Sequence, residues 1–148
     1  MAKEIIETEF DNLVVENDFV DLGSVTISFV NNIAWIVTRE FAEISVEDMQ
    51  KQLDVCAAYY HVQNFGVLVD ASKYCVISNQ AKSLLASSAY SNRKAIAIVS
   101  RSLPLRMLAN FYISVFKPNT PTRLFKNVDE SEKWLNNMLS QQQDQSSN

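Results

Sequence analysis

The sequence predicts a mixed α/β domain in which helices pack on a largely parallel sheet that starts with an N-terminal β-hairpin. Two short segments, residues 67–69 and 95–99, consist only of apolar residues, as expected of strands that are covered on both faces. Segments with helical periodicity alternate with these strands, and such alternation is typical of right-handed β–α–β crossovers. A strand with period-two alternation precedes Asn31 and Asn32, which predict a tight turn into an antiparallel partner.

The first part of the chain is expected to hold three strands and one helix. The strands are residues 10–16, which make a weak one, and the hairpin arms at residues 25–29 and 33–38. Ser45 and Asp48 have the spacing of a near-capping box and predict the start of a helix. Apolar side chains then recur at helical spacing as far as about His61, namely Met49, Leu53, Cys56 and Tyr60.

Boundary residues predict the units that follow. Gly66 is expected to end the first unit, and Ser78 is expected to cap a second helix that runs to about Ser91. The buried strand at residues 95–99 comes next.

A third helix is expected from Ser102 to Lys117, with Pro104 in its first turn, where proline is tolerated. A short strand at residues 122–125 leads to a last helix, which Asp129 is expected to cap.

Composition predicts a single domain, residues 1–140, followed by a mobile tail at residues 141–148, which has nothing to bury. An apolar fraction of 47% suffices for a core, and no apolar run approaches the about 18 residues of a membrane-spanning helix. The N-terminus lacks the positive region and apolar core of a signal peptide. Because its two cysteines, Cys56 and Cys75, are expected to be buried free thiols, the chain is expected to stay in the cytoplasm.

Charge is distributed unevenly along a chain whose net charge is −4. Residues 71–128 contain nine basic residues and no acidic one, whereas residues 1–70 contain 13 acidic and three basic residues. The basic segment is expected either to bind an anionic partner, such as a phosphate, an acidic protein or anionic lipid, or to face the acidic half within the fold or across a dimer.

The third predicted helix is more apolar than an ordinary surface helix. Its polar residues form only a narrow strip, and the rest of its surface is apolar. Leu105, Leu108, Tyr112, Val115 and Phe116 form one stripe, which Met107, Phe111 and Ile113 widen. Another element, a second subunit, another protein or an acyl chain is expected to cover this surface.

Three segments carry a resemblance to a known family: VLVDASK at residues 67–73, ANFYISVFKPNTPTRLF at residues 109–125, and Trp134-Leu135. Over nearly its whole length the chain resembles the STAS domain, the fold of bacterial anti-sigma-factor antagonists. It resembles more closely the uncharacterised bacterial STAS/SEC14-like (sporulation-antagonist-like) proteins. The resemblance implies a STAS-like, SpoIIAA-like fold, and it implies little about function because that family is largely without an assigned activity.

In the antagonists, a serine in an Asp-Ser-Ser-Gly-like motif is phosphorylated, and the phosphate blocks binding to an anti-sigma kinase. The matching positions here are Ser78, Asn79, Gln80 and Ala81, so the phosphorylated position falls on Asn79 and the motif is lost. Ser78 is expected to be either an N-cap, which stabilises the helix by about 1 kcal/mol, or a residue whose phosphate the helix start would stabilise.

Six residues form the candidate set for binding a partner or ligand. Asp70 and Ser72 follow a parallel strand at its carboxyl end, where open α/β sheets usually bind ligands. Asp70 is alternatively expected to accept hydrogen bonds from nearby backbone N–H groups. The helix-start residues Ser78 and Asn79 and the basic residues Arg101 and Arg106 complete the set.

Recognisable metal, cofactor and catalytic motifs are missing from the sequence. No cysteines or histidines have metal-ligand spacing, and two isolated glycines make no phosphate loop or dinucleotide fingerprint. The negative net charge argues against nucleic-acid binding. The single histidine, His61, has no serine or cysteine with a supporting acid at a recognisable spacing.

Three functions follow as hypotheses. The first is a non-catalytic regulatory or interaction domain that binds a protein partner and forms a homodimer. The alternative is a small-molecule or lipid carrier, which the SEC14-like similarity and the basic second half favour. The third is an enzyme that uses Asp70, Ser72 or His61.

Overall fold

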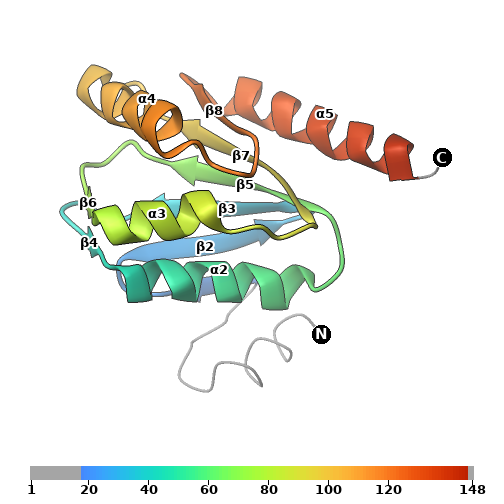
Figure 1. Cartoon of the computed structure of the whole chain (residues 1–148), viewed down its shortest axis with the longest axis horizontal. Coiled ribbons are helices and arrows are strands. Elements are labelled where there is room, and N and C mark those ends of the chain that lie inside the picture. Colours follow the sequence, from blue (N-terminus) through green and yellow to red (C-terminus); the bar gives the residue numbers. More distant parts are fainter. Residues whose placement is uncertain (1–17, 147–148) are drawn as a thin grey trace.

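The fold is a six-stranded sheet with helices on both faces (Figure 1). The computed structural model describes residues 18–146, with side chains as far as residue 141, so the expected strand at residues 10–16 lies outside the described residues. The strands of the large sheet are β1 (Phe19–Asp21), β2 (Val25–Val30), β3 (Ile33–Thr38), β5 (Phe65–Asp70), β7 (Arg93–Val99) and β8 (Thr122–Phe125). The helices are α2 (Val46–Tyr60), α3 (Asn79–Ser87), α4 (Leu103–Phe116) and α5 (Val128–Ser146). A separate two-stranded sheet pairs β4 (Glu43–Ile44) with β6 (Val76–Ile77).

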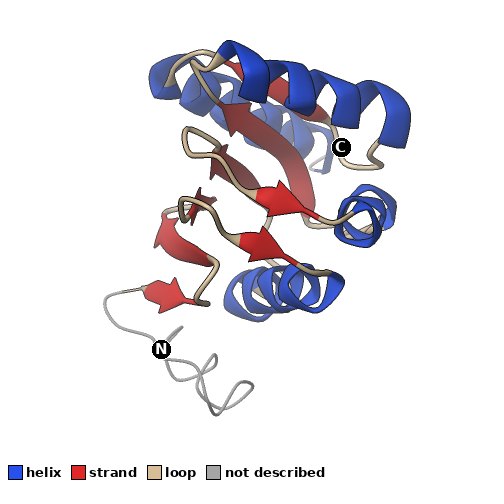
Figure 2. Cartoon of the chain, turned by 90° about the vertical axis from the view of Figure 1, so that its left-hand side faces the viewer, coloured by secondary structure: helices blue, strands red, loops and turns tan. Residues whose placement is uncertain are grey.

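Strand pairing confirms the predicted mixed sheet, whose order is β1-β2-β3-β5-β7-β8. β1, β2 and β3 pair antiparallel, and β3, β5, β7 and β8 pair parallel. The hairpin turns at Asn31, whose φ of 54° is a left-handed conformation that asparagine tolerates. Figure 2 shows the strands in one twisted layer, with helices above it and to its right. The carboxyl ends of the four parallel strands therefore meet at one edge of the sheet.

The helices cover the two faces of the sheet unequally. α5 packs on β5, β7 and β8, and its fully buried Leu135 belongs to a small core with Leu68. α2 and α3 pack side by side on the other face, over a larger core that includes Ile27 and Tyr60. α4 packs against β8 and α3, and among its described residues only Tyr112 is buried. The cover on the second face is therefore least complete at α4.

Local geometry confirms the predicted starts of α2 and α4. The Asp48 N–H donates to Ser45 Oγ and the Ser45 N–H donates to Asp48 Oδ2, both at 3.1 Å, which completes a capping box. Ser102 Oγ accepts a hydrogen bond from the Leu105 N–H at the start of α4. Lys117 ends α4, as predicted, and the structure places it in the left-handed conformation.

Gly66 lies inside β5, so the prediction that it ends a unit is wrong. It pairs with Ile33 of β3 and Ala95 of β7. A Cβ atom at this position would lie 3.1 Å from Leu135 Cδ2 and 3.6 Å from the Ala95 carbonyl oxygen. The missing side chain lets α5 approach the strand, and a close approach of this kind is a common reason for glycine within a strand.

The second helix, α3, ends at Ser87 rather than near Ser91. Ser88 has an extended backbone, and its Oγ donates a hydrogen bond to the Leu85 carbonyl oxygen at 2.6 Å. Serine side chains that bond to nearby carbonyls compete with the helix, which explains the earlier end.

The last helix, α5, starts at Val128, and its cap is Asn127 instead of the predicted Asp129. Asn127 Oδ1 accepts the Glu130 N–H at 2.9 Å, while Asp129 lies in the first turn, where an acid is also favourable. The helix continues to Ser146, past the expected domain end at residue 140, and the division into domain and tail stays a prediction.

Both cysteines are free, as predicted. Cys56 is buried, also as predicted, whereas Cys75 is only half-buried. Burial raises the pKa of the Cys56 thiol to about 12. Between residues 18 and 146, no helix has a stretch that is long and apolar enough to cross a membrane.

Replacing Gly66 with valine is expected to lower the free energy of unfolding by about 1–3 kcal/mol, because the new side chain overpacks the contact between β5 and α5. Urea denaturation of the purified chain measures the change. The matched control is Gly66→Val combined with Leu135→Ala, which should lose less stability than the sum of the single variants. Strictly additive losses would show that Leu135 is not the reason for the glycine.

Candidate functional site

The carboxyl ends of β5, β7 and β8 surround a hollow of about 430 Å³, which we call the carboxyl-edge hollow. It brings together Asp70, Ser72 and Arg101 from the predicted set. Sequence reasoning missed Ser100 and Lys126, although each follows directly after a predicted strand, as Asp70 does. The lining residues are Asp70, Ser72, Val99, Ser100, Arg101, Ser102, Lys126, Asn127, Val128 and Asp129.

Asp70 and Arg106, both from the predicted set, already have hydrogen-bond partners within the chain. Asp70 Oδ1 accepts the Ser72 N–H at 3.0 Å, which confirms the expected local bond. Arg106 Nη1 donates to the Ser100 carbonyl oxygen at 3.1 Å, which places Arg106 beside the hollow without lining it. The Asp70 side chain therefore stabilises the loop that follows β5, and the Arg106 hydrogen bond links α4 to the residue that follows β7.

Ser78 and Asn79 lie at the start of α3 and do not line the hollow. Ser78 Oγ accepts the Ala81 N–H at 3.0 Å, so Ser78 is the N-cap that the sequence predicts. Whether Ser78 is ever phosphorylated stays a prediction.

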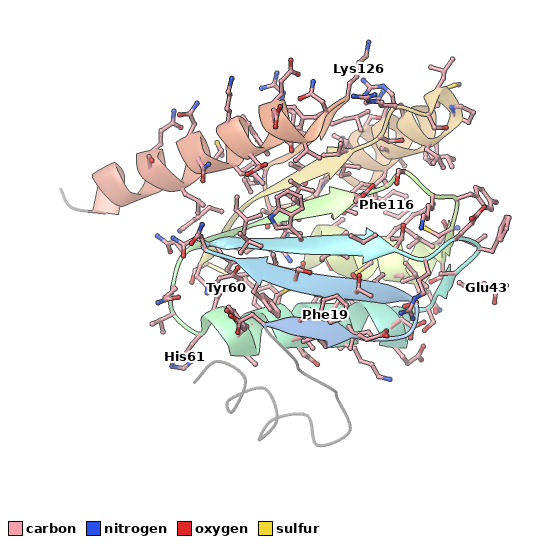
Figure 3. The ribbon with its side chains drawn as sticks, turned by 180° about the vertical axis from the view of Figure 1, so that it is seen from behind. Phe19, Glu43, Tyr60, His61, Phe116 and Lys126 are labelled. Atoms are coloured by element: carbon pink, nitrogen blue, oxygen red, sulfur yellow. The ribbon has the colours of Figure 1, made fainter. Side chains whose placement is uncertain are left out.

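His61 does not meet Asp70 or Ser72, so these three residues do not form a catalytic group. His61 caps the C-terminal end of α2, before β5 begins, whereas Asp70 ends β5. A six-residue strand of roughly 17 Å separates the two positions. Figure 3 shows His61 far from Lys126, which marks the carboxyl edge. Among the described residues, no group of three or more histidine, cysteine or acidic residues lies close enough to hold a metal ion.

The outward surface of α4 is apolar and exposed. Four of its side chains recur every fourth residue and make one stripe, and a fifth lies beside them. These five residues, which we call the outer face of α4, are Leu103, Met107, Phe111, Val115 and Leu108, and each is between 52% and 68% exposed. No described element covers this surface, although the sequence led us to expect a cover.

The inward surface of α4 forms the wall of an apolar cavity of about 190 Å³, which we call the α4 cavity. Most of its other walls come from α2, α3 and the strands β3, β5 and β7, and β4, β6 and β8 each add one residue. Leu105, Leu108 and Tyr112, from the predicted stripe, line it. Within the predicted stripe, Leu105 and Tyr112 therefore face inward, whereas Leu108 and Val115 are more than half exposed. Met107 and Phe111, which were expected only to widen the stripe, form part of the exposed surface.

Arg93 is a buried cation in the wall of the α4 cavity, and sequence reasoning missed it. Its residue exposure is 5%, and its Nε and Nη2 donate to Thr120 Oγ1 at 3.2 and 2.7 Å. Nη2 also donates to Ser88 Oγ at 2.9 Å, and the guanidinium carbon lies 5.4 Å from the centre of the Tyr90 ring. Among the described side chains, Arg93 makes no salt bridge. Burial lowers the pKa of Arg93, so its charge is held in an unfavourable environment.

Two further polar groups in the cavity wall are buried without a hydrogen-bond partner among the described residues. They are Gln52 Nε2 on α2 and the Tyr112 hydroxyl on α4. Burial raises the pKa of Tyr112 to about 12, and the nearby Arg93 opposes the rise. Native structures contain few such groups, and each calls for an explanation.

Comparisons with known proteins identify a family and a fold. A family model described as "Domain of unknown function (DUF7793)" matches residues 27–139. No curated protein matches the chain. A crystal structure of an uncharacterized protein from the DUF3478 family, with a SpoIIAA-like fold, from Shewanella loihica PV-4, superposes with a TM-score of 0.52. The match covers 75% of this chain and 91% of that chain at 13% sequence identity, so it shows the predicted SpoIIAA-like fold and nothing more.

Replacing Ser78 with alanine is expected to lower the free energy of unfolding by about 1 kcal/mol, because the Ala81 N–H loses its capping acceptor. Urea denaturation measures the loss. Asn79→Ala is the matched control, since the exposed Asn79 side chain makes no hydrogen bond among the described residues and should change stability by less than about 0.5 kcal/mol. Equal losses in both variants would contradict the capping role.

Cys56 is expected to resist iodoacetamide in the folded chain, because its thiol is buried and its pKa of about 12 leaves little thiolate near pH 8. Cys75, which is half-buried, should be alkylated first, and denaturant should make both thiols react. Mass spectrometry of peptides from a time course measures the two rates. Equal rates in the folded chain would contradict the buried position of Cys56.

Proposed function

We propose that this chain, which belongs to the family described as Domain of unknown function (DUF7793), is a non-catalytic STAS-like interaction domain that binds another polypeptide on the outer face of α4. The observation that carries the proposal is the exposure of the five apolar side chains of that face. The free thiols of Cys56 and Cys75 favour a reducing compartment, and we place the domain in the cytoplasm.

Exposure of the outer face is unfavourable unless a partner covers it. Burying one large apolar side chain is worth about 1.5–3 kcal/mol. Contiguous apolar patches on a folded surface mark interaction sites more often than scattered apolar residues do. Phe111 lies in the middle of the stripe, where a partner would remove it from water most completely.

Charge around the helix favours a partner that is a different polypeptide. α4 and its flanks carry Arg101, Arg106 and Lys117 and no acidic residue. A second copy on the same face would bring basic helix ends together in a parallel orientation and in an antiparallel one, and like charges at an interface are unfavourable. We therefore infer a partner with an apolar face bordered by aspartate or glutamate, and the expected homodimer becomes an outcome of the test.

The other residues of the predicted binding set lie at different places relative to the outer face of α4. Asp70 and Ser72 line the carboxyl-edge hollow with Arg101, next to the start of α4, and we propose them as the polar rim of the contact. Ser78 and Asn79 lie on α3 and stay predicted contacts.

A carrier of a small or lipid molecule is the second candidate function, and a separate observation favours it. The α4 cavity lies on the inward side of the helix whose outward side is the proposed docking surface. The two functions use opposite sides of α4, which have only Leu108 in common, and they do not exclude each other.

Phe111→Ser is expected to weaken partner binding by about thirty-fold, since a central aromatic side chain often contributes about 2 kcal/mol to an interface. The full chain first captures proteins from an extract of the source organism, and mass spectrometry identifies them. Affinity for the purified partner is then measured by titration calorimetry at low and high salt, and added salt should weaken binding because charges contribute.

Val62→Ser is the matched control, because it removes an exposed apolar side chain outside α4. This control should bind the partner like the unmodified chain. Equal binding by Phe111→Ser and the unmodified chain would overturn the proposal. A dimer in native mass spectra that Phe111→Ser dissociates would show that the occupant is a second copy.

A further inference from the structure

The α4 cavity combines an apolar interior with cations only. Its charged lining residues are Lys73, Lys82 and Arg93, and no acidic residue lines it. All three belong to the acid-free segment, residues 71–128, for which the sequence predicted an anionic partner as one alternative. An apolar cavity with this charge pattern fits a ligand that has an apolar body and an anionic group.

We infer that the α4 cavity binds a small monocarboxylic acid, with its apolar body inside the cavity and its carboxylate on Arg93 and the Tyr112 hydroxyl. This inference rests on the second candidate function, because it names the class of molecule that such a carrier would hold. It does not depend on a partner at the outer face of α4.

Arg93 is the group that selects an anion. It is buried, it has no carboxylate partner among the described side chains, and its hydrogen bonds go to the neutral oxygens of Ser88 and Thr120. A buried guanidinium gains most from an anion that neutralises it. Its Nε and Nη2 are already used by Thr120 and Ser88, and its Nη1 makes no hydrogen bond among the described residues, so Nη1 can donate to a carboxylate oxygen. A neutral ligand would not neutralise the buried charge of Arg93.

Tyr112 and Gln52 supply the donors that a carboxylate can use. Both side chains are more than nine-tenths buried, both line the cavity, and the Tyr112 hydroxyl and Gln52 Nε2 have no partner among the described residues. A carboxylate accepts about four hydrogen bonds. The mutual influence of Tyr112 and Arg93 on their pKa values indicates that these two groups lie near each other.

The size of the cavity limits the apolar body. A cavity of about 150 Å³ already holds a benzene ring, and the α4 cavity measures about 190 Å³. The body packs against aliphatic side chains from four elements, among them Val67 of β5, Leu85 of α3, Ile96 of β7 and Leu105 of α4. Octanoate is a suitable probe, because it joins a flexible chain of moderate length to one carboxylate.

Titration calorimetry of the full chain with octanoate is expected to give saturable binding of one molecule per chain. 1-Octanol is the matched ligand control, because it has the same chain without the charge. It should bind at least about ten-fold more weakly, since a hydrogen bond to a charged group contributes a factor of about ten or more.

Tyr112→Phe should weaken octanoate about ten-fold and leave 1-octanol nearly unchanged, because it removes only a hydroxyl that has no internal partner to lose. Ala109→Phe places a ring in the cavity and should abolish binding of both ligands. Circular dichroism and urea denaturation verify that each variant is folded. Both variants avoid Arg93, whose bonds to Ser88 and Thr120 also hold the fold together.

Phe111→Ser separates this inference from the proposed docking function, because Phe111 does not line the cavity. This variant should keep octanoate binding even if it loses the protein partner. Failure of octanoate to bind, equal affinity for 1-octanol, or octanoate binding that neither Tyr112→Phe nor Ala109→Phe changes would overturn the inference.

Discussion

The structure depends on the close approach of α5 to the centre of the sheet. Gly66 provides the space for Leu135, and the neighbouring strand contributes the small residues Ala95 and Ala97 to the same core. With these small residues on the strands, one helix, α5, packs on β5, β7 and β8 and buries the middle of that face. The remaining three helices are then all available for the opposite face, and their packing there determines which surfaces and cavities the molecule presents.

On that opposite face, large side chains keep α4 from packing as tightly as α5 does. Tyr112 reaches in from α4, while Arg93 enters from β7 with its bonds to Ser88 and Thr120. A guanidinium and a phenol occupy more room and need more hydrogen bonds than the alanine side chains beneath α5. α4 therefore packs farther from the sheet, and a cavity remains between them. The exposed outer face and the cavity therefore share one structural origin.

Local signals made most of the fold predictable. The capping box of Ser45 and Asp48, the Ser102 cap and the hairpin turn at Asn31 each depend only on residues that are close in the sequence. Gly66 was misjudged because the reason for it lies in a distant helix, and no neighbouring residue reports that contact. Long-range packing decides such positions, and a periodic pattern carries no information about it.

The candidate sites also differ in whether nearby residues or long-range packing determine them. The position of Asp70 at a strand end led us to place a candidate site at the carboxyl edge of the sheet, where a hollow lies. Ligand binding there stays a prediction. The sequence could not predict the α4 cavity, because no nearby residue distinguishes Arg93, which is buried, from Arg101, which is exposed. Under the two proposals, ligand and partner act on opposite sides of one loosely packed helix. A ligand that changes partner affinity by some factor must, by linkage, have its own affinity changed by the partner by the same factor.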